Sequence, residues 1–482
     1  MNTQYHERNI SMVMDMYELT MSNGYLNQGF KDTWVAFDVF YRNNPDNGGF
    51  AIFAGLQQVV EYIENLHFSE EDVEYLRSKR LFTEEFLEYL LHFRFRGDIY
   101  AMKEGTVMYP NEPVITVVAP LIDAQLIETT ILLEINHQSL IATKTNRIVQ
   151  AANGKPVSDF GARRAHNVDA AVYGARAAYI GGAAGTATVL AGKMFHIPIS
   201  GTMAHSWVMT FDGEYDAFKA YAESYPDGTV LLVDTYDVLK SGVPNAIRTA
   251  REVLEPMGKK LIGIRLDSGD LAYLSKEARK MLDEAGLSDC MIVASNSLDE
   301  YTISSLNRQG AKIDSYGVGE RLITSSSTPV FGAVYKLVAI QKDGKFIPKI
   351  KISETAEKIT NPGIKEVYRV YDENGKAVAD YLAVKGEQIR DLEPVRYVDP
   401  VNYWKNRSFV GCRFKKLQVP VFEKGKRIYD LPDIEEIRQY VKDQLENEIW
   451  EEEQRFENAH THYLDMSPAM FELKMSLLHE EN

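Results

Sequence analysis

Residues suited to binding anions stand just after short apolar runs in the middle of the chain. Arg265 can offer a planar fork of donors to a carboxylate or phosphate, and Asp267 can accept hydrogen bonds from sugar hydroxyls. Gly317 and Gly319 follow another run, where backbone N–H groups can point at a phosphate. His205 lies among small and hydroxyl residues in the stretch IPISGTMAHSWVMTF. The combination indicates a site for an anionic phosphosugar, with a histidine close by and no cysteine nucleophile.

Each of these features also has an ordinary structural explanation. A lone histidine in a mixed apolar segment can be a core residue that bonds a backbone carbonyl. The acidic loop 267–270 can be an Asx turn or a helix cap, and the segment 317–319 can be a simple turn. The arginines can form surface salt bridges. Only the combination is specific, so its meaning depends on the elements that bring these residues together.

Short apolar strands alternate with helical patterns between about residues 150 and 340. The spacing predicts strands at 156–160, 197–199, 229–234, 261–265, 291–295 and 315–319, with helices such as 169–182 and 275–285 between them. Repeated βα units of roughly 25–40 residues are typical of a parallel barrel or a doubly wound sheet. In a barrel the carboxyl ends of all strands meet at one mouth. The polar residues that end these strands are therefore expected to converge.

The segments on either side predict a second, mixed domain. Before the barrel segment the sequence indicates several helices, a strand at 34–41 and a small β-unit at 100–118, and after it hairpin turns predict returning β-structure over 335–400. We therefore expect an N-terminal α+β domain over 1–140, completed by about 335–400, a β/α barrel over 141–334, and a helical C-terminal extension over 401–482.

Composition narrows the class of protein. The 482 residues carry a formal net charge of −16, which disfavours nucleic acid and anionic membranes as main partners. Two cysteines are too few for a disulfide framework or a zinc cluster, and no run of apolar residues is long enough to span a membrane. We expect a cytoplasmic protein without a metal site built from its own side chains.

Seven motifs make the chain similar to the nicotinate phosphoribosyltransferase family of type II phosphoribosyltransferases. They are DMYELTM (15–21), DFGARRAH (159–166), GTMAHSWVMTF (201–211), LLVDTYDVLKSGVPNA (231–246), GIRLDSGDLA (263–272), ASNSLDE (294–300) and YGVGERLIT (316–324). The similarity extends from about residue 8 to 400 and is weaker beyond. It implies an irregular parallel β/α barrel.

The resemblance also implies a reaction of NAD salvage. Nicotinate and phosphoribosyl pyrophosphate would give nicotinate mononucleotide and pyrophosphate with Mg²⁺, coupled to ATP hydrolysis through a phosphohistidine at His205. By the same resemblance the nicotinate site contains Tyr17, Phe160, Thr202 and Arg265, and the phosphoribosyl pyrophosphate site contains Arg163, Asp267, Gly317, Gly319, Glu320 and Lys336. The family's architecture further implies a homodimer with active sites shared between subunits.

Two positions bear on how the family resemblance is interpreted and on the alternative functions of the chain. Glu320 stands where many relatives have a small hydroxyl residue, so only its backbone N–H could serve a phosphate. Nicotinamide phosphoribosyltransferases carry an Asp where this chain has Ala187, and an Asp there would repel a carboxylate, so Ala187 favours nicotinate. A catalytically silent binding homologue is the other alternative, against which the intact His205, Arg265 and Asp267 argue.

Overall fold

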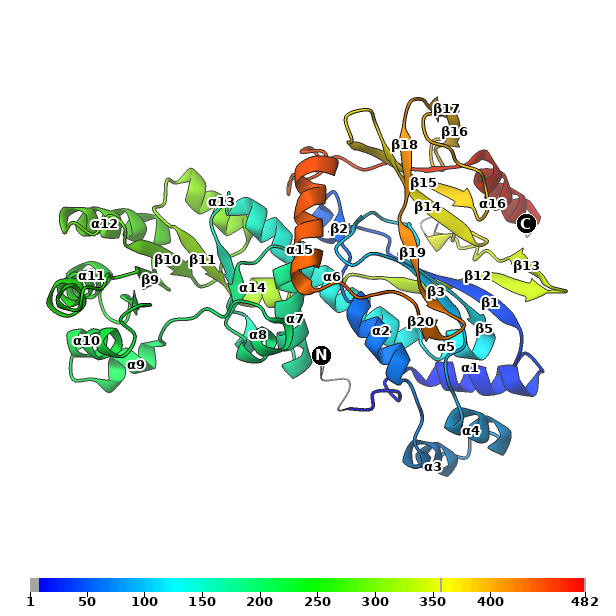
Figure 1. Cartoon of the computed structure of the whole chain (residues 1–482), viewed down its shortest axis with the longest axis horizontal. Coiled ribbons are helices and arrows are strands. Elements are labelled where there is room, and N and C mark those ends of the chain that lie inside the picture. The colour runs from blue at the N-terminus through cyan, green and yellow to red at the C-terminus, as the bar shows by residue number, and fades with distance from the viewer. Residues whose placement is uncertain (1–7, 356–357, 405, 481–482) are drawn as a thin grey trace. The chain divides into compact units, whose positions relative to one another are not determined.

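The chain folds into two compact units. A computed structural model describes residues 8–355, 358–404 and 406–480 (Figure 1). Unit 1 combines the chain up to Thr143 with the chain from Val330 onward, and unit 2 comprises Lys144–Pro329. Unit 2 is thus inserted in the sequence of unit 1. Each unit has its own hydrophobic core.

Unit 2 is built on a six-stranded parallel sheet. Its strands are β6 (Val157–Asp159), β7 (Gly185–Thr186), β8 (Val230–Leu232), β9 (Gly263–Leu266), β10 (Met291–Ser295) and β11 (Ser315–Val318). The order is β7-β6-β11-β10-β9-β8, so β11 returns to β6, and an isolated parallel bridge joins Thr186 to Ile199 beyond β7. This strand order is that of a barrel. The single bridge extends the sheet from β7 into the chain segment that lies between β7 and β8. The predicted irregular parallel β/α barrel is confirmed.

Helices flank these strands and begin at polar caps. The helices are α7 (Val168–Ile180), α8 (Val189–Phe195), α9 (His205–Thr210), α10 (Glu214–Ser224), α11 (Val243–Thr249), α12 (Leu271–Glu284), α13 (Glu300–Arg308) and α14 (Glu320–Ile323). Asn167, Asp270 and Asp299 accept backbone N–H groups at the starts of α7, α12 and α13. The strands are short and mostly buried because helices cover the outside of a parallel sheet and leave little of it in water.

Unit 1 contains two large sheets. The first has the order β13-β12-β1-β5-β3-β19-β20, with β1 (Trp34–Phe40), β3 (Asp98–Met102), β5 (Ile115–Pro120), β12 (Val334–Lys342), β13 (Lys345–Pro348), β19 (Gln418–Glu423) and β20 (Lys426–Arg427). The second has the order β17-β16-β21-β15-β14-β18, with β14 (Lys365–Tyr371), β15 (Ala377–Val384), β16 (Val395–Val398), β17 (Asn406–Phe409), β18 (Arg413–Lys416) and β21 (Leu464–Met466). A small pair joins β2 (Ala51–Ile52) to β4 (Val107–Met108). β12 pairs with β1, so the chain after the barrel rejoins the N-terminal segment, as its hairpin turns predict.

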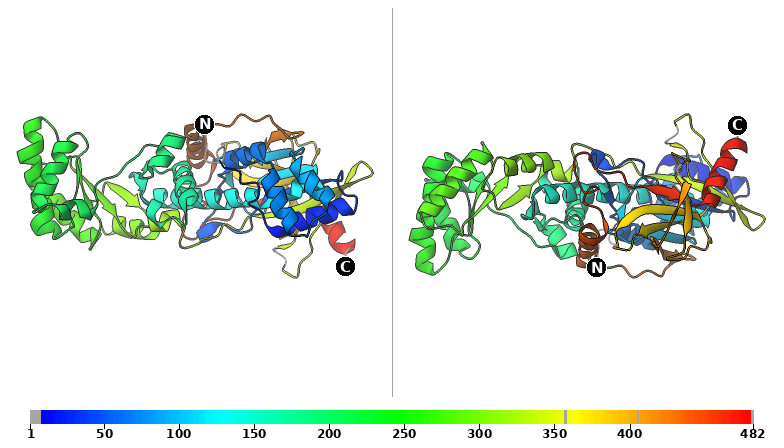
Figure 2. Two further views of the ribbon diagram at one scale, coloured as in Figure 1. Left: turned by 90° about the horizontal axis from the view of Figure 1, so that it is seen from below. Right: turned by 90° about the horizontal axis from the view of Figure 1, so that it is seen from above.

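The helices of unit 1 gather mainly in its N-terminal part. They are α1 (Met16–Asn27), α2 (Leu56–Asn65), α3 (Glu70–Ser78), α4 (Glu84–Leu91), α5 (Leu121–Gln125), α15 (Ile434–Asp443) and α16 (Pro468–Glu480), and the long α6 (Glu128–Ala151) contributes residues to both units. Figure 2 shows the blue helices α1–α4 close together on one side of the sheets of unit 1. Asp15 and Glu18 form a capping box that fixes the start of α1.

The C-terminal segment differs from its prediction in part. Helices α15 and α16 confirm the helices expected over 401–482, but the same segment also contains strands β17 to β21. One of them, β19, pairs with β3 across the register Gln418↔Met102 to Phe422↔Ile99. These strands are short, and β18, β19 and β21 find their partners far away in the sequence. Local periodicity therefore does not reveal them.

A buried network of charges ties the C-terminal segment to the sheets of unit 1. Arg369 on β14 and Asp380 on β15 are fully buried and form two hydrogen bonds of 2.9 and 2.8 Å. Burial acts to raise the pKa of Asp380, but the Arg369 charge and hydrogen bonds from Glu112 and His462 outweigh it and lower that pKa. Burial and the nearby Asp380 raise the pKa of Glu112, so Glu112 is held protonated. The positive charge of Arg369 is therefore balanced by the negative charge of Asp380 inside the core.

His462 completes this network from the loop before β21. Its ring stacks on Tyr109 with centroids 3.7 Å apart, and its Nδ1 lies 3.0 Å from Glu453, which also accepts a 2.6 Å hydrogen bond from the Tyr109 hydroxyl. Burial disfavours the imidazolium, but the carboxylates of Asp380, 3.5 Å from Nε2, and of Glu453 outweigh burial and raise the pKa of His462. The direction of this shift favours the protonated form of His462 in the folded protein.

We expect the contribution of His462 to stability to depend on pH. A raised pKa in the folded state stabilises the protein fully below the unfolded value, about 6.5, and the effect is lost as pH rises through the folded value. His462→Gln is expected to lower the melting temperature more at pH 6 than at pH 9, with a loss on the order of 1.5–3 kcal/mol at the lower pH, the range for a charged hydrogen bond. Thermal unfolding at the two pH values measures the difference.

The neighbouring His460 provides the matched control for this comparison. His460 is exposed, so His460→Gln removes an imidazole from the same loop without removing a buried charge. Its melting temperature is expected to follow the wild type at both pH values. An equal loss for His462→Gln at pH 6 and pH 9 would show that the network does not hold a histidine cation.

Within the described residues, the helices offer no segment of sufficient length and hydropathy to cross a bilayer.

Candidate active site

The residues predicted to bind nicotinate from unit 2 lie together at the carboxyl ends of the strands. Phe160 directly follows β6, Arg265 lies in β9, and Thr202 follows the bridge that continues from β7. Arg265 Nη1 donates a 3.0 Å hydrogen bond to Thr202 Oγ1. The Arg265 guanidinium lies 5.7 Å from the centroid of the Phe160 ring. A cationic fork, a hydroxyl and an aromatic ring thus meet in one place.

Arg265 is held by acceptors on three sides. Besides its bond to Thr202, Nε donates to Ser295 Oγ at 2.8 Å and Nη2 donates to Asp267 Oδ1 at 2.9 Å. Only 15% of the Arg265 side chain is exposed. Nη1 also donates a longer bond of 3.4 Å to the Met203 carbonyl, so of the five N–H donors only one, on Nη2, is left without a protein acceptor. The fixed guanidinium can present this Nη2 donor to a ligand carboxylate, together with an Nη1 donor if the carboxylate displaces the long bond to Met203.

Asp267 stands beside this arginine as an ionised carboxylate. Burial acts to raise its pKa, but hydrogen bonds from Ser295 and Arg265 and the Arg265 charge outweigh burial, so the pKa lies below its ordinary value. Its other oxygen, Oδ2, lies 3.6 Å from Nε2 of His205. Asp267 is thus charged at neutral pH and connects the arginine with the histidine.

His205 is the first residue of α9 and is partly open to solvent. Its side chain is 39% exposed, and its Nδ1 lies 3.1 Å from the Thr235 hydroxyl. Nε2 faces two carboxylates, Asp267 at 3.6 Å and Asp234 at 3.9 Å. The sequence allowed His205 to be a core histidine bonded to a backbone carbonyl. Its exposure and its hydroxyl and carboxylate neighbours favour the functional interpretation.

Phe160 keeps its place through a glycine and a buried carboxylate. A Cβ at position 317 would lie 2.4 Å from two atoms of the Phe160 ring, so only glycine at the end of β11 leaves room for it. Asp159 accepts bonds from Gly161 N and Thr186 Oγ1, both at 2.8 Å, which fixes the turn that carries Phe160. Gly317 was predicted for the phosphate site. In the structure it also accommodates the aromatic ring.

The predicted phosphate loop lies after β11. Gly319 precedes α14, and Glu320 begins that helix with an exposed side chain. Arg321, the next residue, pairs with Asp299 at 2.5 Å and so ties this loop to the start of α13. Arg163 lies exposed in the short turn after Phe160, with no ion pair in the described part of the chain. Its guanidinium is available to an anion.

Two further predicted residues belong to unit 1. Tyr17 lies near the start of α1 and is 42% exposed. Burial of its hydroxyl and the Glu128 carboxylate raise its pKa, so Tyr17 stays neutral and can donate to Glu128. Glu18, the next residue, is buried and bonds Thr129 of α6, and burial raises the pKa of Glu18 to about 7. These contacts anchor the helix turn that presents Tyr17.

Lys336 lies on β12, opposite Asp38 of β1. Burial and the nearby cations Lys351 and Arg42 lower the pKa of Lys336, and Glu128 acts in the opposite direction. Glu128 is therefore a neighbour of both Tyr17 and Lys336 within unit 1. The Nε atom of Arg42 is buried and has no hydrogen-bond partner among the described residues. Lys336, Lys351 and Arg42 thus concentrate positive charge in one part of unit 1.

Several of these contact residues have no role assigned by the family resemblance, although Asp234, Thr235 and Ser295 lie within its motifs. In unit 2 they are Asp234, Thr235 and Ser295, and in unit 1 they are Arg42, Lys351 and Glu128. Asp234 and Ser295 end predicted strands, so the convergence of strand ends in a barrel was the signal that could have found them. Arg42, Lys351 and Glu128 carry no comparable signal because they lie on separate elements of unit 1.

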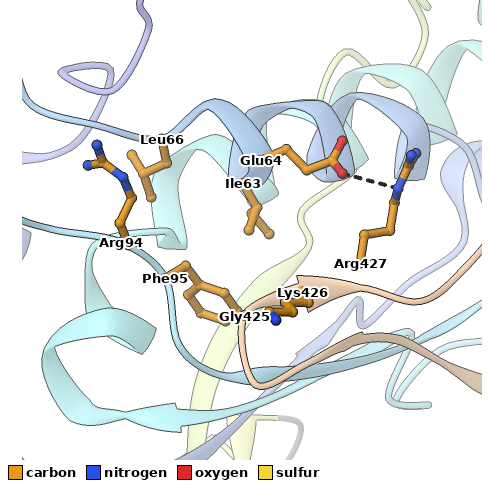
Figure 3. A pocket seen from close by; sticks show the side chains of 8 residues that line it. All are labelled: Ile63, Glu64, Leu66, Arg94, Phe95, Gly425, Lys426 and Arg427. Atoms are coloured by element: carbon orange, nitrogen blue, oxygen red, sulfur yellow. Dashed lines mark ion pairs between the residues drawn. The ribbon is translucent and has the colours of Figure 1, made fainter.

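A separate pocket of 430 Å³ lies in unit 1 (Figure 3). Its lining includes the cationic side chains Arg94, Lys426 and Arg427 together with Glu64, which pairs with Arg427 at 3.1 Å. None of the predicted site residues lines it. In the described part of the chain, no cluster of three or more His, Cys, Asp or Glu side chains is arranged to hold a metal ion.

The fold and the site define a class of protein before any comparison. A parallel β/α barrel whose strand ends gather an arginine fork, an ionised aspartate, a glycine loop and a partly exposed histidine is the arrangement of a type II phosphoribosyltransferase. Three family models match the chain. They are the nicotinate phosphoribosyltransferase N-terminal domain (residues 12–136), the nicotinate phosphoribosyltransferase family (156–375) and the nicotinate phosphoribosyltransferase C-terminal domain (364–474).

Individual relatives agree with these models. The chain is 46% identical over 477 residues to nicotinate phosphoribosyltransferase of Bacillus subtilis, covering 99% of this chain and 96% of the relative. It is 41% identical to nicotinate phosphoribosyltransferase pncB2 of Mycobacterium tuberculosis, covering 90% and 87%. The crystal structure of human nicotinic acid phosphoribosyltransferase is similar with a TM-score of 0.86 at 26% identity, covering 97% of this chain and 100% of the human one. The chain belongs to the nicotinate phosphoribosyltransferase family.

Proposed function

We propose that this protein forms nicotinate mononucleotide and pyrophosphate from nicotinate and phosphoribosyl pyrophosphate, coupled to ATP hydrolysis. The observation that carries the proposal is the Arg265 fork, held by Thr202 and lying over Phe160, in a member of this family. The free Nη2 donor of Arg265, with the Nη1 donor released from its long bond to Met203, would bind the carboxylate of nicotinate, and Phe160 would pack against its ring. A bidentate bond to a carboxylate also sets the orientation of the pyridine nitrogen that attacks the ribose.

The phosphoribosyl group is assigned to the neighbouring residues. Asp267 would take ribose hydroxyls, while Gly317, Gly319 and the backbone N–H of Glu320 would face the 5′-phosphate. Arg163, exposed beside this loop, and Lys336 from unit 1 would add positive charge for phosphate oxygens. In this scheme the leaving pyrophosphate departs as nicotinate approaches the ribose C1.

His205 would carry the phosphoryl group from ATP. The carboxylates of Asp234 and Asp267 near Nε2 favour the tautomer with the proton on that nitrogen. Nδ1 then keeps its lone pair and accepts a hydrogen bond from the Thr235 hydroxyl. When the Thr235 hydroxyl turns away from Nδ1, the neutral imidazole can attack the γ-phosphoryl of ATP through that lone pair, with ADP as leaving group. Hydrolysis of the phosphohistidine would complete the coupling.

Magnesium fits the donors of this site. Mg²⁺ is usually held by one or two carboxylates together with substrate phosphates and water. Asp234 is buried, and its Oδ1 has no hydrogen-bond partner among the described residues. With Asp267 it offers hard oxygen ligands beside the predicted phosphate positions. Bound there with the phosphates, Mg²⁺ would neutralise the charge that develops on pyrophosphate.

Product analysis with nicotinate and with nicotinamide tests the proposal directly. Ala187 follows β7 and is exposed at the strand ends, so the position offers no carboxylate to repel nicotinate. We expect nicotinate mononucleotide from the acid and little product from the amide. Preference for the amide would instead identify a nicotinamide phosphoribosyltransferase. No product from either, and no acid-labile label from γ-labelled ATP, would identify a silent homologue.

We assign the reaction to the cytoplasm and to NAD salvage.

We further propose a homodimer with shared active sites. Tyr17 belongs to unit 1, whereas His205 and Arg265 belong to unit 2. Helix α1 and the segment just before its cap expose apolar side chains to water, among them Val13, Met16 and Tyr17 with 42%, 46% and 42% of their surface exposed. An exposed apolar patch of this kind is typical of an interface. In the proposed dimer, Tyr17 of one subunit stacks on nicotinate in the barrel of the other.

Two inactive variants are expected to complement each other if the sites are shared. Co-refolded Tyr17→Ala and Arg265→Ala chains would give about half mixed dimers, and each mixed dimer has one site with both native residues. Activity should return to roughly a quarter of the wild-type value by the same counting. Mixed dimers without activity would show that each site is built within one chain.

A further inference from the structure

Ser295 ends β10, the strand that lies between β9 and β11 in the parallel sheet of unit 2. Its side chain is buried, with 3% of the residue exposed. The motif matches place no function on it, and it lies behind the side chains predicted to touch substrate. A buried hydroxyl at the mouth of a barrel must have hydrogen-bond partners, and these partners indicate its role.

Both hydrogen bonds of Ser295 go to residues of the predicted site. Its Oγ accepts from Arg265 Nε at 2.8 Å and donates to Asp267 Oδ1 at 2.5 Å. The direction of each bond is fixed, because a guanidinium can only donate and an ionised carboxylate can only accept. Arg265 Nη2 also donates to the same Oδ1 at 2.9 Å. The three side chains therefore close a ring of hydrogen bonds.

This ring determines which atoms face a ligand. It engages Nε of Arg265, so the guanidinium edge that remains for a carboxylate is the one formed by Nη1 and Nη2. It engages Oδ1 of Asp267 twice, so Oδ2 is the oxygen that faces His205 at 3.6 Å. Without the hydroxyl, Arg265 Nε would lose its acceptor and the Asp267 carboxylate could rotate about its χ2 angle.

We propose that Ser295 is a positioning residue that holds Arg265 and Asp267 as one unit, and so couples recognition of the nicotinate carboxylate to recognition of the phosphoribosyl group. The inference rests on the proposed function. Ser295 itself touches neither substrate in this scheme. Its contribution is to fix the orientation of two groups that bind different substrates, so a single change at Ser295 should affect both of them.

The test is Ser295→Ala, with Ser295→Thr as the conservative variant. We expect the KM values for nicotinate and for phosphoribosyl pyrophosphate each to rise about tenfold. Loss of the Ser295 hydroxyl leaves a charged donor unpaired, which costs roughly one charge-assisted bond at the binding site of each substrate. Ser295→Thr keeps the hydroxyl and should restore both KM values to within a few-fold of wild type. A serine with a merely structural role would lower the yield or stability without raising the two KM values together.

Ser305→Ala in α13 is the matched control, because its hydroxyl bonds only the side chain of Gln309 among the described residues. If the wild type makes product but Ser295→Ala keeps both KM values within twofold, the inference is overturned and the proposed function stands. If the wild type makes no product, the proposed function fails, and a double-mutant cycle in melting temperature between Ser295→Ala and Arg265→Ala still tests the unit. Additive losses of melting temperature in that cycle would overturn the inference that Ser295 and Arg265 act as one unit.

Discussion

Replacing His205 with alanine is expected to abolish ATP hydrolysis coupled to nicotinate mononucleotide formation, and to leave a slow transfer that does not use ATP. The imidazole is the only predicted phosphoryl acceptor in the site, and its neighbours are Thr235, Asp234 and Asp267. With γ-labelled ATP, acid-labile label on the protein should fall to background. The amount of ADP formed per molecule of nicotinate mononucleotide should fall together with this label. Because 39% of the side chain is exposed, the fold should tolerate the change.

His196 provides the control for this experiment. It ends α8 in the left-handed region with a φ of 58°, a conformation that asparagine tolerates better than most residues. His196→Asn should therefore keep both the label and the coupling. If His205→Ala still hydrolysed ATP in step with product formation, His205 would not be the phosphoryl acceptor.

Replacing Arg265 with lysine is expected to raise the KM for nicotinate by a large factor. An ammonium group can reach at most one or two of the acceptors Ser295, Thr202 and Asp267, and it cannot form a two-bond fork with a carboxylate. Loss of a charge-assisted bond costs on the order of 1.5–3 kcal/mol, which corresponds to roughly a 10- to 150-fold rise in KM. Initial rates over a range of nicotinate concentrations measure it.

The KM for ATP is the internal control for this variant. Arg265 has no predicted role toward ATP, so the KM for ATP in the His205 phosphorylation step should change little. An unchanged KM for nicotinate would place the carboxylate of nicotinate at another cation, such as Arg163 or a residue of unit 1.

The barrel and the centre of its site could be predicted because their signals are local. Each strand of unit 2 is a short apolar run that ends in a polar residue, and parallel strands bring those ends to one edge. That rule alone predicts that Thr202, Arg265 and Asp267 converge, and hydrogen bonds of 3.0 and 2.9 Å join them in the structure. The other site residues could be predicted only from the family motifs, because no regular spacing in the sequence relates Tyr17 or Lys336 to the barrel strands.

Other features had no local signal. β19 pairs with β3 through a register that links residues of the last fifth of the chain to residues near 100, and no periodicity within either strand indicates this partner. The roles of Asp234 and Ser295 depend on which oxygen or hydroxyl faces which neighbour. Such orientations follow from side-chain packing in three dimensions. Arg42, Lys351 and Lys336 likewise become one group of cations only after the sheet of unit 1 has formed.

The insertion of unit 2 within unit 1 sets an order of events during protein synthesis. β1 and β12 are neighbours in one sheet but are separated by roughly 300 residues, which the ribosome adds in about 15–60 s at about 5–20 residues per second. All strands of unit 2 emerge within that interval, so the barrel can close while one edge of β1 is still unpaired. The nascent chain therefore carries a finished second unit attached to an open first one. Molecules whose translation stops near residue 330 would expose this edge permanently and should be the chains that chaperones retain.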